Sequence, residues 1–354
     1  MSMLRASAMV GALLVLAGCE VQDEASRLDG ATDGSRVVLD GAEPEPDVFL
    51  PADAAPDMPP LDATPDGRAD AALDSSARDM AADSAPDATP DAGPDAAPID
   101  MELPSACQPW ADVPDDALVA ALHAELHRTY RPIAAEPDFG GNPNRYTTAR
   151  RLMFTEIEWY EDPERGQGGH QCAYTGRFIA GPADQEPDDD IMNCEHTWPR
   201  ARMSARDTLA YSHEQSDIHH LLPTISGVNS LRGSEYFGDV EDGRNLDFLP
   251  AVYGTDAAGN VVFQPWRERQ GDVARVIFYF SVRWGKAIAD AEEQTLRGWM
   301  VDDPVDRRER ARNDLIERIQ GNRNPFVDCP RLVERIADFA AFEPLDTEEN
   351  LPAP

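Results

Sequence analysis

Residues 20–104 constrain the fold of this chain more than any other feature. The segment contains 22 acidic residues, four Arg, 12 Pro and no Lys, Trp or Tyr. Such a composition cannot bury enough apolar surface to offset the entropy of ordering the backbone. We therefore predict a disordered, self-repelling tether over residues 19–104. The folded structure is expected in one domain at residues 105–344, followed by a flexible tail at 345–354.

The charge of the whole chain is −35 at pH 7, which excludes a protein that holds nucleic acid through bulk positive charge. A protein embedded in a membrane is excluded too, because there is only one long apolar run, near the start. The tether accounts for only half of the excess, since residues 105–354 carry 44 acidic and 26 basic residues. A nucleic-acid site in the domain would therefore depend on a local cluster of Arg.

Residues 1–18 have the features of an export signal. One positive charge, Arg5, precedes the apolar stretch Ala6–Leu16, which is too short to cross a bilayer as a helix. The stretch runs into Leu16-Ala17-Gly18-Cys19, which resembles the lipobox of bacterial lipoproteins. We expect lipidation of Cys19 and an exported protein anchored to the cell envelope, at the outer membrane or cell surface, or shed from it. An ordinary secretory signal with a chance Cys is the alternative.

Helical periodicity dominates the domain. Apolar spacing and composition predict helices over residues 115–131, 147–159, 271–286, 305–320 and 329–342. Strand patterns cover only residues 178–180, 191–196 and 261–263. The sequence therefore predicts the α+β class, a mostly helical monomer with a small antiparallel sheet.

Four cysteines lie in the domain, and an exported protein can oxidise them. Cys107 and Cys329 flank the domain, whereas Cys172 and Cys194 lie 22 residues apart. Among the three pairings that four cysteines allow, we favour these two pairs. A zinc site is the rival interpretation, although the chain has no Cys-x-x-Cys pair.

The residues that suggest chemistry begin with Glu195-His196, a carboxylate beside an imidazole on a predicted strand. Downstream, Pro223-Thr224 is expected to open a helix with Thr224 as its N-cap, which places Asn229 about one turn into that helix. Carboxylate and amide oxygens are hard ligands that suit Mg²⁺ or Ca²⁺. A His near such a metal can take a proton from water at neutral pH.

These stretches resemble the bacterial endonuclease I family, whose core is a ββα-metal, or His-Me, finger. The resemblance rests on Glu195-His196-x-x-Pro199, on Asp217-x-His219-x-Leu221-x-Pro223 and on Val228-Asn229-x-x-Arg232. Similar signatures extend it from about residue 130 to 330: Tyr146-x-x-Ala149-Arg150-x-x-Met153-Phe154, Gly271-Asp272-Val273-Ala274-Arg275-x-x-Phe278-Tyr279 and Asn324-Pro325-Phe326-Val327-Asp328.

The resemblance implies an exported endonuclease that cuts DNA, and often RNA, with little sequence preference and leaves 5′-phosphate products. It implies that His196 is the general base and that Glu195 and Asn229 hold one Mg²⁺, for which Mn²⁺ or Ca²⁺ could substitute. It also implies an Arg that holds the phosphate. Several candidates compete for this role: Arg200 and Arg202 as catalytic residues, and Arg206 and Arg232 as further phosphate ligands.

Two other functions stay open at this point. One is a catalytically degenerate nuclease fold that serves as a binding module on the cell surface. The other is a zinc hydrolase built from His213, His219, His220 and cysteines. The nuclease hypothesis itself carries a geometric condition, because neighbouring residues on a strand point to opposite faces. Glu195 and His196 can serve one metal only if the strand ends or twists there.

Overall fold

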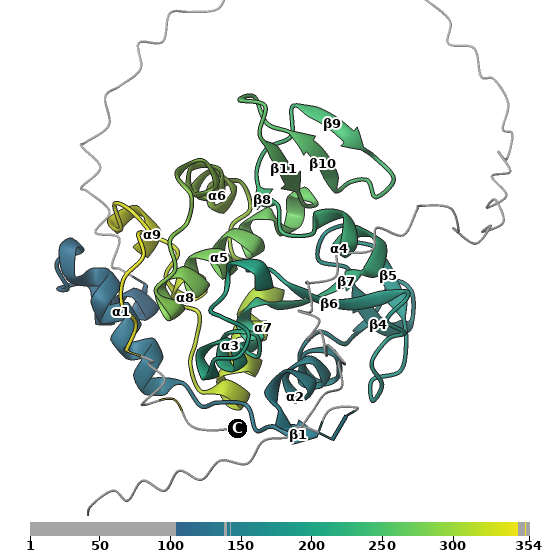
Figure 1. Cartoon of the computed structure of the whole chain (residues 1–354), viewed down its shortest axis with the longest axis horizontal. Coiled ribbons are helices and arrows are strands. Elements are labelled where there is room, and N and C mark those ends of the chain that lie inside the picture. Colours follow the sequence, from purple (N-terminus) through teal and green to yellow (C-terminus); the bar gives the residue numbers. More distant parts are fainter. Residues whose placement is uncertain (1–103, 138–139, 142, 346–350, 352–354) are drawn as a thin grey trace, which may run out of the picture. The chain divides into compact units, whose positions relative to one another are not determined.

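The computed structural model describes residues 104–137, 140–141, 143–345 and 351 (Figure 1). The predicted export signal, Cys19, nearly all of the tether and most of the predicted tail lie outside these residues. Where the chain is described, helices combine with small sheets, so the predicted α+β class is confirmed. None of the described helices has the length and hydropathy needed to cross a membrane.

Helix α5 (Gln270–Trp284) lies among the other helices, and nearly all of its residues are buried, as its apolar sequence predicts. It packs against α1 (Asp115–Thr129), α6 (Asp290–Asp302) and α8 (Pro325–Asp328) (Figure 1). The helix ends at Gly285, whose φ of 65° forms the left-handed cap that glycine adopts without strain.

Helix α7 (Arg307–Gln320) closely follows the predicted charged helix. Its N-cap is Asp306, whose carboxylate accepts the backbone N–H of Glu309 at 2.7 Å. Part of its charged face points inward, where Arg312 and Arg308 bind the buried carboxylate of Glu158 with N···O distances of 2.6 and 3.4 Å. Glu158 directly follows the π-helical turn Met153–Ile157, which continues α2 (Arg145–Leu152).

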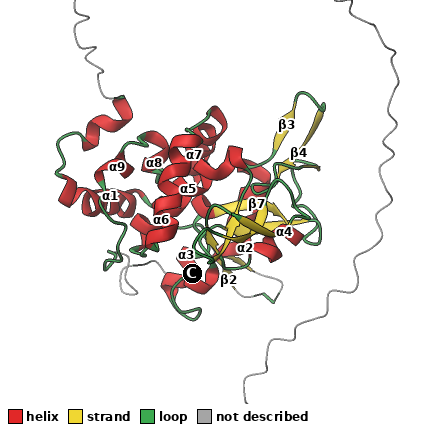
Figure 2. Cartoon of the chain, turned by 90° about the horizontal axis from the view of Figure 1, so that it is seen from above, coloured by secondary structure: helices red, strands yellow, loops and turns green. Residues whose placement is uncertain are grey.

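The strands of the described residues form four small sheets, which gather on one side of the folded region while most helices gather on the other (Figure 2). Three sheets are antiparallel, and the fourth contains one parallel pair, β8 with β11. The sheets, in strand order, are β1 (Glu136–Pro137) and β2 (Pro143–Asn144); β3 (Tyr160–Asp162), β4 (Gln167–Gln171) and β5 (Phe178–Ala180); β6 (Met192–His196) and β7 (Leu221–Ile225); and β8 (Tyr236–Phe237), β11 (Val261–Gln264), β10 (Val252–Thr255) and β9 (Asp242–Asn245).

Strands β6 and β7 and the helix after them form a compact unit. In the antiparallel register, Glu195 lies opposite Leu222 and His196 opposite Leu221. Helix α3 (Leu209–Glu214) lies in the connection between the strands. Helix α4 (Ser226–Arg232) follows β7 at once and contacts both strands. The chain thus places a helix against a two-stranded sheet within about 40 residues.

Side chains of α5 fix the connection between β6 and β7. The fully buried Asp217 accepts hydrogen bonds from the Tyr279 hydroxyl at 2.9 Å and the Trp284 indole at 3.0 Å. Phe280 stacks on Trp198 with ring centroids 5.0 Å apart. Because these contacts join the connection to the core helix, they hold the end of β6 in place.

The predicted helix start at Pro223-Thr224 is wrong. Thr224 is buried inside β7, where it pairs with Asn193 of β6, and the helix begins at Ser226 instead. The backbone of this segment pairs with a strand about 30 residues earlier, and that long-range pairing overrides the local capping signal.

The predicted helix over residues 329–342 is also wrong, because only the single turn α9 (Leu332–Arg335) forms. Arg297 of α6 donates hydrogen bonds to the carbonyl oxygens of Val333 and Ile336, both at 2.7 Å. Phe339 is bonded through its backbone N–H to the carboxylate of Glu293 at 3.1 Å. The chain therefore satisfies its backbone groups against α6 and not within a longer helix.

The predicted disulfide between Cys107 and Cys329 forms, with a Cα–Cα distance of 5.2 Å. The second predicted pair is wrong, because Cys172 and Cys194 are both free and buried. The N–H of Ala173 donates to the carbonyl of Pro223 on β7, and Pro223 pairs with Cys194 on β6. Strand β7 therefore lies between the two cysteines. Two strand spacings are about 10 Å, which exceeds the roughly 7 Å that a disulfide can span.

Candidate active site

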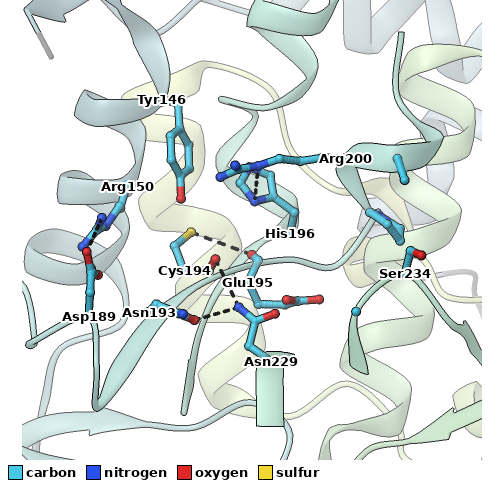
Figure 3. Close-up of a pocket in the computed structure, with 13 residues that line it drawn as sticks. Tyr146, Arg150, Asp189, Asn193, Cys194, Glu195, His196, Arg200, Asn229 and Ser234 are labelled. Atoms are coloured by element: carbon cyan, nitrogen blue, oxygen red, sulfur yellow. Dashed lines mark hydrogen bonds and ion pairs between the residues drawn. The ribbon is translucent and has the colours of Figure 1, made fainter. Parts of the chain in front are cut away.

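A cavity of about 470 Å³ opens at the end of β6, and Glu195, His196 and Asn229 all line it (Figure 3). The structure therefore brings together the three residues that the sequence analysis placed in one site. The geometric condition on adjacent strand residues is met, because His196 is the last residue of β6. The remaining lining residues are Tyr146, Arg150, Asp189, Asn193, Cys194, Pro199, Arg200, Ala201, Gly233 and Ser234.

The carboxylate of Glu195 is held from behind by two buried donors. Its Oε1 accepts the hydroxyl of Tyr174 at 2.7 Å and Nη1 of Arg232 at 2.8 Å. Both donors bind the same oxygen, so Oε2 carries neither bond. Burial raises the pKa of Glu195, while the charge of Arg232 acts in the opposite direction. The arrangement fixes one oxygen and leaves the other for a ligand in the cavity.

The side chain of Asn229 is oriented by its amide nitrogen. Nδ2 donates to Oδ1 of Asn193 at 2.7 Å and more weakly to the carbonyl of Cys194 at 3.5 Å, as Figure 3 shows. Asn229 is the fourth residue of α4 and is only partly buried. Because the nitrogen is occupied by β6, the carbonyl oxygen of the side chain is directed away from that strand and serves as an acceptor on the cavity side.

The imidazole of His196 is held as one neutral tautomer. Nε2 lies 3.1 Å from the carbonyl oxygen of Gln215, which can only accept, so Nε2 carries the hydrogen. Nδ1 accepts Nε–H of Arg200 at 3.3 Å and is therefore the basic nitrogen. Burial, together with the nearby His220 and Arg200, holds the pKa of His196 well below its ordinary value. The ring is thus uncharged at neutral pH and has a lone pair on Nδ1.

Arg200 is the one of the four predicted Arg that lines the cavity. It is exposed, and its guanidinium lies 4.8 Å from the ring centroid of Tyr146, which in turn lies 4.9 Å from the His196 ring. Its polar contact is a single hydrogen bond to the uncharged His196 Nδ1, so no carboxylate balances its charge there. The guanidinium is therefore available to an anion that enters the cavity.

The other three predicted Arg lie elsewhere. Arg232 is fully buried and holds Glu195 together with the carbonyl oxygens of His196 and Thr197, so it supports the site from inside. Arg202 binds the buried Glu292 at 3.0 Å and does not line the cavity. Arg206 is exposed in the loop after Arg202 and also does not line it.

Residues that the sequence analysis did not place in the site complete it. Tyr146 and Arg150 come from α2, and both belong to a stretch that already resembled a family signature. Arg150 is bound to Glu186 at 2.7 Å and to Asp189 at 2.5 Å, so its charge is largely neutralised. No sequence pattern around Tyr174 indicates a role in the site, because its contact with Glu195 depends on how two separate sheets pack together.

The histidines after Asp217 are structural. Nε2 of His219 bonds the carbonyl of Asn322 at 3.2 Å, and Nε2 of His220 bonds the carbonyl of Glu214 at 2.8 Å. Burial is the largest cause that lowers the pKa of His219 to about 3 and that of His220 to about 4. Over the described part of the chain, no three His, Cys, Asp or Glu side chains lie so that they could hold a metal. This geometry does not support the zinc hypothesis.

A strand–strand–helix unit that presents a carboxylate, an amide oxygen and a neutral imidazole to one cavity is typical of hydrolases that activate water. Comparison with known families agrees: residues 160–331 match the family model described as Endonuclease I. Over these residues, which make up nearly half of the chain, the sequence is similar to the endonuclease I family.

Similarity to individual proteins points the same way. The chain is 34% identical over 165 residues to an "Extracellular ribonuclease" of Bacillus subtilis (strain 168), covering 41% of this chain and 53% of the relative. It is 30% identical over 118 residues to an "Extracellular deoxyribonuclease" of Aeromonas hydrophila, covering 33% and 51%. It is 27% identical over 198 residues to "Endonuclease-1" of Buchnera aphidicola, covering 53% and 67%. The chain spans about half the length of the first two of these relatives.

Proposed function

We propose that this chain is an exported, metal-dependent endonuclease that hydrolyses phosphodiester bonds of DNA, and of RNA, with little sequence preference. The observation that carries the proposal is the convergence of Glu195, His196 and Asn229 on one cavity. The names of the relatives, two of which act outside the cytoplasm on RNA or DNA, support the substrate class and the export. The products are expected to carry 5′-phosphates.

The residues present fit one Mg²⁺, with Mn²⁺ or Ca²⁺ as substitutes. Oε2 of Glu195 and Oδ1 of Asn229 would hold it, because the other polar atoms of these side chains are engaged by Tyr174, Arg232 and Asn193. Mg²⁺ commonly takes few protein ligands and completes its shell with water and substrate oxygens. When bound, the ion would stabilise negative charge on the phosphate and on the leaving 3′ oxygen.

His196 acts as general base through Nδ1, which accepts the proton of the attacking water. Its hydrogen bond to the carbonyl of Gln215 through Nε2 stabilises the ring after it gains that proton. For water to reach Nδ1, Arg200 must leave it, and the scissile phosphate provides the negative partner that draws the guanidinium away. Arg200 is therefore our choice for the Arg that holds the phosphate.

Arg232 and Tyr174 act as positioning residues. Neither lines the cavity, and both bind Oε1 of Glu195. Two buried donors on one oxygen keep a metal-binding carboxylate in one rotamer and leave its second oxygen for the metal.

Outside the described residues, we propose that Cys19 carries a lipid and that residues 19–104 tether the nuclease domain to the envelope. The names of the relatives support export but do not bear on the anchor. A tether that is acidic throughout would keep the domain away from an anionic membrane surface.

The proposal is tested by digestion of supercoiled plasmid with the purified full-length chain, with Mg²⁺ and with EDTA in place of the metal. We expect cleavage that EDTA abolishes, and a loss of about 10²- to 10⁴-fold in rate for His196→Ala, as for other general bases. His127→Ala on α1, away from the cavity, is the matched control and should cut like the parent. Plasmid binding by the parent chain without any cleavage would favour the binding-module alternative.

A further inference from the structure

Tyr236 stands out on the surface beside the candidate active site. It is 43% exposed, and among the described Phe, Trp and Tyr residues the others are all less exposed. Its neighbour on β8, Phe237, is 1% exposed and packs into the core. Because successive residues of a strand point to opposite faces, the burial of Phe237 holds Tyr236 outward.

One face of the Tyr236 ring rests on a fixed guanidinium. The Cζ atom of Arg202 lies 4.3 Å from the ring centroid. Arg202 donates to Oε2 of Glu292 at 3.0 Å, while Oε1 of the same carboxylate accepts the backbone N–H of Phe237 at 3.0 Å. Glu292 is 2% exposed, so its carboxylate joins strand β8 to Arg202 from within the protein and fixes the guanidinium relative to the strand. The ring is therefore held in one orientation against Arg202, and the residue is partly open to solvent.

The Tyr236–Arg202 pair lies next to the cavity along the chain without lining it, and Tyr236 also lines a second cavity together with Gly238, Asp239 and Asn260. Ala201 and Ser234 line the cavity, Arg202 follows the first directly, and Tyr236 lies two residues after the second. Two residues span at most about 7 Å of extended chain. Stacked bases along one strand are about 3.4 Å apart. A nucleotide one or two positions from a phosphate in the cavity can therefore reach the ring.

We propose that Tyr236, backed by Arg202, is a stacking platform for an unpaired base next to the scissile phosphate. The inference rests on one part of the proposed function, namely that a phosphodiester binds in the cavity. A planar ring with a cation behind it binds the π-face of any base, so the platform is indifferent to sequence. In a duplex the bases are already stacked on each other, so the platform favours single-stranded DNA or RNA.

The test measures binding apart from cleavage. Fluorescence anisotropy in EDTA gives the Kd of the full-length chain for a labelled oligothymidylate and for a hairpin duplex of the same charge. Stacking on an aromatic side chain is worth enough per base that Tyr236→Ala should weaken the single-strand complex about 5- to 150-fold. The duplex Kd should change less than about twofold, a size that corresponds to under half a kcal/mol.

Two matched variants separate stacking from other roles. Tyr236→Phe keeps the ring and should bind the single strand like the parent, whereas Val301→Ala removes an exposed apolar group on α6 and should leave both Kd values unchanged. An equal loss on duplex and single strand would overturn the proposal, and so would an unchanged Kd in Tyr236→Ala or a loss in Tyr236→Phe as large as that in Tyr236→Ala.

A second measurement does not depend on a folded alanine variant. Irradiation of the parent chain with an oligonucleotide that carries 5-bromouracil should attach the base to Tyr236, which peptide mapping detects. Attachment elsewhere alone would contradict the platform. If the oligonucleotide binds in this way while plasmid is not cut with Mg²⁺, the proposed function fails and the platform stands.

Discussion

The hydroxyl of Tyr174 offers a sharp test of how the site is built. Tyr174→Phe removes one oxygen that donates to Oε1 of Glu195 at 2.7 Å and leaves the ring in its packing against Phe263 and Phe237. The side chain is fully buried, so no solvent group replaces the donor. The carboxylate would then be supported by Arg232 alone.

The expected cost follows from the kind of bond that is lost. A hydrogen bond to a charged group contributes about 1.5 to 3 kcal/mol to stability. For a domain of this size, 1 kcal/mol shifts Tm by about 2 to 4 °C, so we expect Tm to fall by about 3 to 12 °C. The carboxylate also loses orientation, and changes of this kind around metal ligands typically reduce metal affinity or activity about 10- to 100-fold.

Thermal unfolding followed by circular dichroism measures the first effect, and the Mg²⁺ concentration for half-maximal plasmid cleavage measures the second. Tyr253→Phe is the matched control, because Tyr253 on β10 does not line the cavity and its hydroxyl has no hydrogen-bond partner among the described residues. A double-mutant cycle with Glu195→Gln isolates the pair. Our reasoning is refuted if Tyr174→Phe and Tyr253→Phe have the same Tm and the cycle shows no coupling.

Two further predictions concern stability. His219 and His220 have pKa values of about 3 and 4 in the fold, below their ordinary 6.5, so the unfolded chain binds more protons below pH 6.5. The free energy of unfolding from urea titrations should therefore decrease as pH falls from about 6.5 to 3, and a flat profile over that range would contradict the neutral, buried imidazoles. Replacement of Cys107 and Cys329 by Ala opens a loop with a sequence separation of 222 residues, which should reduce the free energy of unfolding by about 3 to 5 kcal/mol. The same double substitution without any loss of urea resistance would show that the cross-link does not restrict the unfolded chain.

The sequence predicts best where local periodicity and packing agree. Helices α1, α5 and α7 lie where their apolar or charged patterns predict, because each pattern is long and continuous. Strand β6 also lies where the sequence predicts it, and Glu195, His196 and Asn229, which the sequence motifs placed in one site, line one cavity.

Long-range contacts explain what the sequence does not predict. Thr224 has the features of an N-cap, but its backbone is needed for pairing with β6. The place of Arg232 in the sequence motif suggests a phosphate ligand, but its guanidinium binds the buried carboxylate of Glu195, 37 residues away in the sequence. Cys172 and Cys194 lie near each other in sequence and are separated by β7. In each case the partner is set by the tertiary fold, which a local pattern does not contain.

The domain is acidic overall, and most of the Arg side chains near the candidate site are paired with carboxylates of the protein. Arg150 is neutralised by Glu186 and Asp189, and Arg202 by Glu292, so these cations are engaged within the protein. Arg200 is left at the cavity with an imidazole as its polar contact. The proposed site therefore attracts a phosphate through one guanidinium and a metal ion, and we expect binding of long nucleic acids that is weaker than in basic nucleases and depends less steeply on salt concentration.

The most direct test of the account is the position of a divalent ion. A crystal soaked in Mn²⁺ should show an anomalous peak about 2.1 Å from both Oε2 of Glu195 and Oδ1 of Asn229, on the side of the cavity that Nδ1 of His196 faces. A peak that contacts neither side chain, or no peak at a Mn²⁺ concentration that supports full plasmid cleavage, would contradict the claim that these two oxygens hold the metal.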